Sequence, residues 1–240
     1  MTNNNVQQLI SAVEEADSSA KLVEAVQNLA SSASEDAVPT LIAALGYNNP
    51  GAAVAAVDGL IEIGEKAVKP LLQLLDNYNY GARAWAVRAL AGIGDPRGFN
   101  TLLDAAKNDF ALSVRRAAAR GLGTIHWQQM PSEQRSTSQQ QALETLIQVC
   151  HDPEWVVRYA AVTGLEALAN AASETQPDKL PQITAPLLKM ANNDEEVAIR
   201  ARAWMAINQH HSQIEMPNMK TLAESDDEKE VPSRGSGRRS

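Results

Sequence analysis

The sequence is poor in cysteine and in aromatic residues. Its 240 residues include a single Cys, Cys150, so no disulfide can form within the chain and we expect a reducing compartment. Four Trp, four Tyr and two Phe are few for this length, and Ala, Leu and Val carry most of the apolar content. Ala and Leu favour closely packed helices, whereas sheets draw more on aromatic and β-branched residues. The composition therefore predicts an all-α protein.

Basic residues are outnumbered, and long apolar runs are missing. The chain carries 21 Lys and Arg against 29 Asp and Glu, a formal net charge of −8, which opposes binding to the phosphates of nucleic acids. No apolar run approaches the roughly 18 residues that span a membrane, and the polar start at residues 1–5 lacks the features of a signal peptide. We therefore expect a cytoplasmic protein that binds neither nucleic acid nor membrane.

An internal repeat organises most of the chain. Residues 37–64 match residues 67–94 at a shift of 30, with apolar residues, Asn and Gly falling at the same places. Further units follow at shifts of 32, 43 and 42 residues, and we assign the longer shifts to loops at 127–139 and 171–179. With one N-terminal unit, the sequence predicts about six repeats.

Each unit is predicted to contain two helices. The first carries apolar residues at i, i+3, i+4 and i+7, as in Val38, Leu41, Ile42 and Leu45, which is one buried stripe of an α-helix. The second begins after a turn rich in Asn, Asp and Pro and ends at a Gly such as Gly94. Both signals repeat from unit to unit.

A single helix pair of this size cannot bury its apolar face, so the pairs must stack into a superhelix whose concave side is lined by the second helices. The pattern over 152–165 resembles a HEAT repeat. We predict an α-solenoid of about six HEAT-like helix pairs over residues 1–214. A disordered polar tail is expected at 215–240, where almost nothing apolar is present to offset the entropy of ordering.

An arginine recurs at one position of the second helix, and it predicts a structural ladder. At 100° per residue, the positions 3, 7 and 10 residues after this arginine are always apolar and mark the stacking face. The arginines themselves are expected to bond turn carboxylates such as Asp109 and Asp152 of neighbouring units. The ladder arginines are Arg83, Arg115, Arg158 and Arg200.

Positions 1, 2 and 5 after the ladder arginine point away from the stacking face and differ between units. A position that varies while facing outward is free to meet a ligand. These side chains are either ordinary surface or line a concave site in which aromatic faces accompany guanidinium groups suited to carboxylates. The candidates are Trp85, Arg88, Arg116, Arg120 and Tyr159.

The remaining reactive residues point to no catalytic centre. Cys150 occupies the same column as Leu45 and Leu75, so we interpret it as a core thiol. The four His residues show no metal-ligand spacing, and no phosphate-binding loop or nucleophile elbow is present. We therefore expect no metal site, and no catalytic residue can be named from the residues alone.

Two segments carry a family resemblance. Residues 37–54 and 77–97 resemble the E/F-type phycobilin lyases, and more narrowly their F (beta) subunits. The run Tyr-Asn-Tyr-Gly-Ala-Arg-Ala-Trp at 78–85 and the segment 109–116 are far more specific than a general HEAT pattern. The resemblance covers about residues 6–210 and leaves out the tail.

The resemblance implies a lyase that works as an E/F heterodimer. Such enzymes attach phycocyanobilin, a linear tetrapyrrole, through a thioether to a cysteine of the phycocyanin alpha subunit, which agrees with the lack of an exposed catalytic cysteine here. The bilin is then the substrate, and no cofactor is expected. The candidate bilin-binding residues, with an aromatic residue of the specific motif added, are Tyr80, Trp85, Arg88, Arg116, Arg120 and Tyr159.

Three other functions stay open at this stage. A phycobilisome disassembly factor or assembly adaptor with the same repeats would bind bilin or phycobiliprotein without making a bond, and a general HEAT adaptor would bind no pigment. A HEAT-fold base-excision enzyme is opposed by the acidic charge balance. Relatives that also isomerise the bilin carry a His-Cys pair that the turn at 77–81 lacks, so isomerisation is not expected.

Overall fold

The computed structural model describes residues 3–76 and 80–209, and its helices follow one another in pairs. The pairs are α1 (Asn3–Glu14) with α2 (Ser19–Ala30), α3 (Val38–Ala44) with α4 (Pro50–Ile63), α5 (Glu65–Asp76) with α6 (Tyr80–Ile93), α7 (Phe99–Asn108) with α8 (Leu112–Gly123), α9 (Ser132–Val149) with α10 (Trp155–Thr175), and α11 (Leu180–Asn193) with α12 (Val197–Gln209). Short 3-10 helices lie between pairs: η1 (Glu35–Ala37), η2 (Pro96–Gly98), η3 (Trp127–Gln129) and η4 (Pro177–Lys179). The described residues contain no strand, and the predicted all-α solenoid of six pairs is confirmed.

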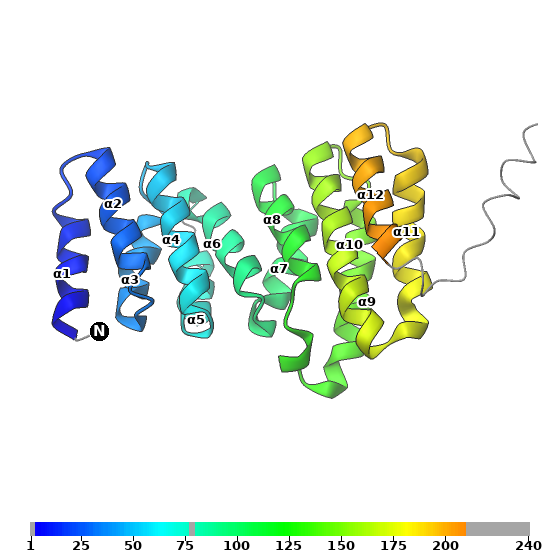
Figure 1. Cartoon of the computed structure of the whole chain (residues 1–240), viewed down its shortest axis with the longest axis horizontal. Coiled ribbons are helices and arrows are strands. Elements are labelled where there is room, and N and C mark those ends of the chain that lie inside the picture. The colour runs from blue at the N-terminus through cyan, green and yellow to red at the C-terminus, as the bar shows by residue number, and fades with distance from the viewer. Residues whose placement is uncertain (1–2, 77–79, 210–240) are drawn as a thin grey trace, which may run out of the picture.

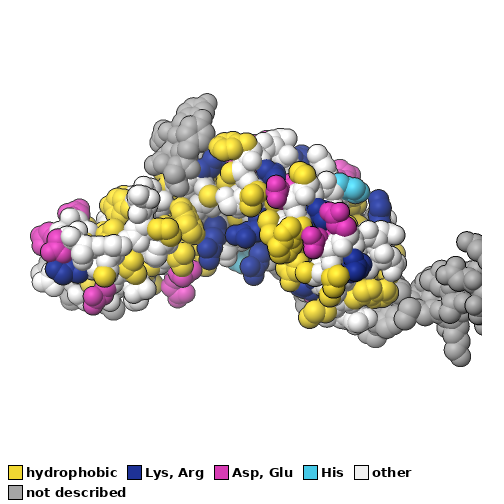
Figure 2. Space-filling view, turned by 90° about the horizontal axis from the view of Figure 1, so that it is seen from above, with side chains coloured by type: hydrophobic (Ala, Val, Ile, Leu, Met, Phe, Trp, Pro, Cys, Tyr) yellow, Lys and Arg dark blue, Asp and Glu magenta, His cyan; other side chains and the backbone are white. Residues whose placement is uncertain are grey.

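The helices form two layers. The second helices of successive pairs pack against one another in the order α2, α4, α6, α8, α10 and α12, and each also packs against the first helix of its own pair. Figure 1 shows the pairs side by side along the long axis of the molecule. In the view of Figure 2 the stack is curved and hollowed in the middle of one side.

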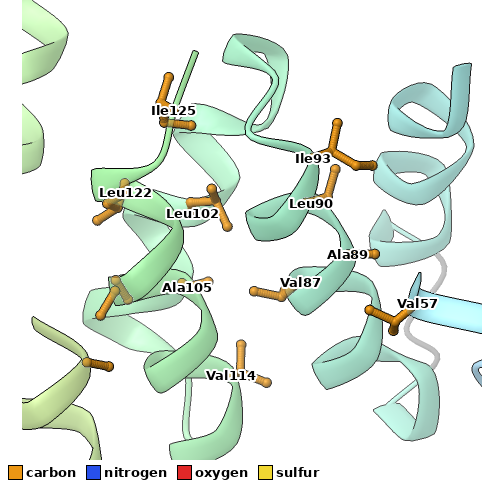
Figure 3. Packing of buried hydrophobic residues seen from close by; sticks show 14 of the residues in the cluster. Val57, Val87, Ala89, Leu90, Ile93, Leu102, Ala105, Val114, Leu122 and Ile125 are labelled. Atoms are coloured by element: carbon orange, nitrogen blue, oxygen red, sulfur yellow. The ribbon is translucent and has the colours of Figure 1, made fainter. Parts of the chain in front are cut away.

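The core lies between the layers and runs the length of the stack. The predicted stacking positions are buried in every unit tested, among them Leu90 of α6, Leu122 of α8 and Leu165 of α10. Figure 3 shows apolar side chains of successive helices filling the space between them, including Leu90, Leu102 and Leu122. Each unit therefore buries its apolar stripe against its neighbours, as expected for a solenoid.

The insertions at 127–139 and 171–179 are largely helical, and the loops expected there are wrong. Helix α9 begins at Ser132 and α10 continues to Thr175. The added turns are held by polar contacts, because Gln176 Nε2 donates to Gln139 Oε1 at 2.7 Å and Lys179 Nζ donates to Ser136 Oγ at 2.8 Å. The predicted domain boundary at 214 and the tail at 215–240 lie outside the described residues.

The ladder arginines link each unit to the next. Arg83 Nε lies 2.7 Å from Asp109 Oδ2, Arg115 Nε lies 2.7 Å from Asp152 Oδ2, and Arg158 Nε lies 2.9 Å from Asp194 Oδ2. Arg115, Arg158 and Arg200 also donate from Nη1 to two backbone carbonyls of the turn that precedes their own helix. One side chain thus fixes the turn before its own helix and the turn of the next unit.

The ladder carboxylates are bonded from both sides. Oδ1 of Asp194 accepts the backbone N–H of Glu196 at 2.9 Å, and Asp109 and Asp152 make the same contact with the residue two positions on. Burial alone would raise the pKa of Asp194, but the hydrogen bonds from Arg158 and Glu196 and the charge of Arg158 outweigh it, so this pKa lies below its ordinary value of 3.8. Asp194 is therefore held in the charged form.

Helices α8 and α10 approach each other so closely that a glycine is required. A Cβ added to Gly123 would lie 2.1 Å from the carbonyl oxygen of Gly164, a backbone atom that cannot move unless the helices separate. We expect Gly123→Ala to lower the free energy of unfolding by about 3 kcal/mol, measured by chemical denaturation. Gly98→Ala is the control, because its Cβ would meet Leu90 at an ordinary 3.7 Å. Equal stability of the two variants would contradict this packing.

The Arg158–Asp194 pair should make stability depend on pH. Arg158→Ala leaves a buried carboxylate without its guanidinium and is expected to cost about 3–5 kcal/mol at pH 7. Because the pKa of Asp194 is lowered in the folded protein, the stabilisation is fully present above about pH 4 and is lost as the pH falls through the folded-state pKa. Denaturation curves should therefore show a smaller difference between wild type and variant at pH 3 than at pH 7. Arg200→Ala, which removes bonds to the preceding turn only, should cost less.

Candidate functional site

A groove of about 800 Å³ runs across the concave face of the stack. Its walls come from the second helices, with Ile61 of α4 at one end and Arg202 of α12 at the other. The size falls within the range of small-molecule sites, and the shape is open along one side. Such a groove can hold an elongated ligand and leave one side of that ligand accessible to another molecule.

Three arginines gather in this groove without acidic partners. Arg88 extends from α6, and Arg116 and Arg120 extend from α8. All three are exposed, and within the described ranges none of them forms an ion pair. Figure 2 shows basic side chains gathered in the hollow. On a chain with a formal net charge of −8, this is a local concentration of positive charge suited to an anion.

Aromatic side chains accompany the arginines. Tyr159 of α10 is half-buried and lines the groove beside Val156 and Thr163. The Arg88 guanidinium lies 5.7 Å from the centroid of the Trp85 ring, within the range of a cation–π contact. The groove therefore offers an aromatic surface next to the unpaired charges.

The far end of the groove holds a carboxylate. Glu166 of α10 is 8% exposed, and Arg202 of α12 donates to both of its oxygens, from Nη1 to Oε1 at 2.8 Å and from Nη2 to Oε2. The hydrogen bond to Glu166 raises the pKa of Arg202, against the effect of burial, and the charge of Glu166 and contact with Tyr159 add to the rise. This end of the groove is thus a fixed ion pair and not a free charge.

The structure brings together four of the six predicted site residues. Arg88, Arg116, Arg120 and Tyr159 all line the groove. Trp85 is half-buried against the core and supports Arg88 without lining the groove itself. The backbone of Tyr80 begins α6, but its side chain lies outside the described part of the structure.

Two charged groove residues are absent from the sequence-based set. Arg202 lies two residues after its ladder arginine, in the same outward position as Trp85, and Glu166 lies eight residues after Arg158. Extending the same analysis to the last unit would have found Arg202. Position 8 falls at about 80°, beside the stacking face, where Gly123 packs against Gly164, so the same rule does not mark Glu166.

The thiol of Cys150 lies away from the groove chemistry. It is 4% exposed in the core, and burial raises its pKa to about 12. Among the residues that the structure describes, no three His, Cys, Asp or Glu side chains come together as metal ligands. No described helix is both long and apolar enough to cross a membrane.

Comparison with known proteins identifies relatives over most of the chain. The family model of HEAT repeats matches residues 6–78, 48–123 and 68–165. The phycocyanobilin lyase subunit beta of Pseudanabaena tenuis is 59% identical over 204 residues, covering 85% of this chain and 72% of that protein. The phycocyanin alpha phycocyanobilin lyase CpcF of Synechocystis sp. is 63% identical over 167 residues, covering 70% of this chain and 78% of that protein.

A solved structure is similar as well. A chain in the complex of CpcE and CpcF of phycocyanin lyase from Nostoc sp. matches with a TM-score of 0.64 and 49% identity. The match covers 71% of this chain and 98% of that one. Sequence and structure thus agree on the same group of relatives.

Cys150 should be unreactive in the folded protein. With a pKa of about 12, roughly one thiol in ten thousand is ionised at pH 8, and the thiolate is the reactive form. We expect a disulfide reagent such as dithionitrobenzoate to leave the native protein unmodified and to react with one thiol after denaturation. Stoichiometric reaction within seconds in the native state would show that the thiol is accessible.

Proposed function

Because the chain belongs to the HEAT-repeat family of phycocyanobilin lyase beta subunits, we propose that it is one half of a two-subunit lyase. The enzyme attaches phycocyanobilin to a cysteine of the phycocyanin alpha subunit, and an E-type subunit is the other half. The name of the Synechocystis relative supports the substrate and acceptor, and the CpcE–CpcF complex supports the pairing. The alternatives of a disassembly factor, a general adaptor or a base-excision enzyme find no comparable support.

The observation that carries this proposal is the set of three unpaired arginines beside an aromatic wall. A linear tetrapyrrole has two propionate groups and flat conjugated rings. Guanidinium groups bind carboxylates with charge-assisted, often bidentate hydrogen bonds, and Tyr159 offers a face to the rings. The arginines come from two adjacent helices whose axes lie about 8–10 Å apart, so one ligand can reach all three.

The chain contributes positioning to the reaction. The acceptor's S–H adds across the exocyclic double bond of the bilin, so that sulfur bonds to carbon, the proton ends on the bilin, and no further reactant is consumed. The nucleophile comes from the acceptor, which agrees with the burial of Cys150. Holding the bilin extended and open to the acceptor replaces an encounter in solution by a fixed geometry.

The reaction needs no additional cofactor in this proposal, since the bilin is the substrate. We place the protein in the cytoplasm of a cyanobacterium, because the relatives come from cyanobacteria.

Removing a groove arginine should weaken bilin binding and transfer. Arg116→Ala and Arg120→Ala each remove a charge-assisted bond, so we expect the bilin affinity of the lyase complex to fall about tenfold or more. Transfer is read as covalent pigment on the phycocyanin alpha subunit in a denaturing gel, after co-expression with the E-type subunit and the enzymes of bilin synthesis.

The control is Lys107→Ala, which removes an exposed cation on α7, outside the groove. It should leave transfer unchanged, and all variants should keep their helix content and their pairing with the E-type subunit. Unaltered binding and transfer in both arginine variants would place the bilin site on the partner and make this chain a scaffold. Binding without transfer in the wild-type complex would favour the non-catalytic alternatives.

A further inference from the structure

The Glu166–Arg202 pair does not belong to the repeated scaffold. The residues eight positions after the other ladder arginines are Ala91, Gly123 and Asn208. Those that share the position of Arg202 are Trp85, Ala117 and Ala160. The Arg–Asp ladder recurs between units. Among the described residues, an ion pair at these two positions occurs once, on the wall of the groove.

The Glu166 carboxylate keeps unused acceptor capacity. A carboxylate accepts about four hydrogen bonds, and Arg202 supplies two. No other group in the described ranges donates to Glu166, although the residue is 8% exposed. Little water can reach a nearly buried carboxylate. Hydrogen-bond donors of a bound ligand therefore stabilise such a carboxylate more than they would stabilise an exposed one.

The charges of the groove are sorted by helix. The three unpaired cations lie on α6 and α8, whereas the one carboxylate among the lining residues lies on α10, the next helix in the stack. Arg202 on α12 holds this carboxylate from the far side. A ligand that fits this order carries anionic groups along one edge and hydrogen-bond donors, with positive charge, a short distance away.

We propose that Glu166 is the counter-ion of the tetrapyrrole nitrogens, with the two propionates directed toward Arg88, Arg116 and Arg120. The inference rests on the proposed function and names the part of the ligand that each end of the groove receives. The pyrrole N–H groups donate to the free lone pairs of Glu166. The carboxylate thereby stabilises the protonated ring system, which is the form more easily attacked by a thiolate. Arg202 is a positioning residue that fixes the carboxylate through two hydrogen bonds.

The test uses the complex of this chain with its E-type subunit and free phycocyanobilin as the probe. Protonation of the bound bilin is followed as the long-wavelength absorption band of the protonated chromophore over a range of pH. An opposite charge in contact shifts a pKa by about 1–3 units, so Glu166→Gln should lower the protonation constant of the bound bilin by about tenfold or more. Glu166→Asp keeps the charge and should restore most of the band.

The other ionisable groups of the groove stay the same in this comparison. They are Arg88 on α6, Arg116 and Arg120 on α8, Tyr159 on α10 and Arg202 on α12. Arg120→Ala should weaken binding of the bilin while the bound fraction keeps its long-wavelength band. Glu154→Gln, an exposed change on the turn before the same helix, is the matched control and should change neither property.

Failure to fold can be separated from loss of the counter-ion. If Glu166→Gln does not form the complex, the double variant Glu166→Gln with Arg202→Gln leaves no unpaired charge and should show the same loss of the band. A variant complex that binds bilin with an unchanged band at every pH overturns the inference. The Glu166–Arg202 pair would then be a structural link between α10 and α12. A wild-type complex that binds no bilin overturns the proposed function and the inference together.

Discussion

The Arg–Asp contact between units is the interaction on which the groove depends. In Arg115 and Arg158 the guanidinium holds two carbonyls of the turn before its own helix and the carboxylate of the next turn. Each of these carboxylates also accepts a backbone N–H of its own turn. A planar guanidinium with five donors in a fixed fork can satisfy both turns at once, which an ammonium group would do less specifically. The repeated geometry sets the spacing of α6, α8, α10 and α12, and so it sets the distances between the side chains on their concave faces. Nearer the N-terminus a neutral contact serves instead, since Asn49 donates to Ser19 of α2 and caps α4.

Arginine has two roles in this protein, and pairing separates them. The ladder arginine Arg158 is buried with its carboxylate, so its charge is neutralised and its contribution is structural. The groove arginines are exposed, and water meets their hydrogen-bonding needs at little cost until a ligand replaces it. Their mutual repulsion is tolerable because they are solvated and because the stack is fixed by other residues. A dianionic ligand relieves this repulsion, and it does so most fully when it reaches the arginines of both α6 and α8.

Much of the fold follows from periodicity, because helix geometry fixes which residues share a face. Six pairs, the buried stacking positions and the outward placement of Arg116 and Arg120 all result from 100° per residue and a repeat that keeps its register. The helical extension at Ser132 was not predictable in the same way, since its polar residues carry no apolar period and depend on contacts such as Gln139 with Gln176. Trp85 is half-buried because its large ring packs against the edge of the core. A smaller side chain at this position would not reach that contact. The pairing of Glu166 with Arg202 joins two units at positions that no repeat relates, so it required the three-dimensional stack.

An open solenoid suits a reaction in which the protein supplies no nucleophile. In the proposed reaction the attacking thiol belongs to the acceptor protein, so a bilin bound in the groove must stay accessible from one side. A closed pocket would exclude the acceptor, whereas the groove between α4 and α12 is walled by one layer of helices and open opposite to it. The ladder fixes the helices, and Arg202 fixes the Glu166 carboxylate before a ligand arrives. Preorganised charge is the part of catalysis that a binding scaffold can provide. The chain can thus assist bond formation through charge and geometry alone, which is consistent with a core thiol that stays protonated and a groove that holds its charges in a fixed order.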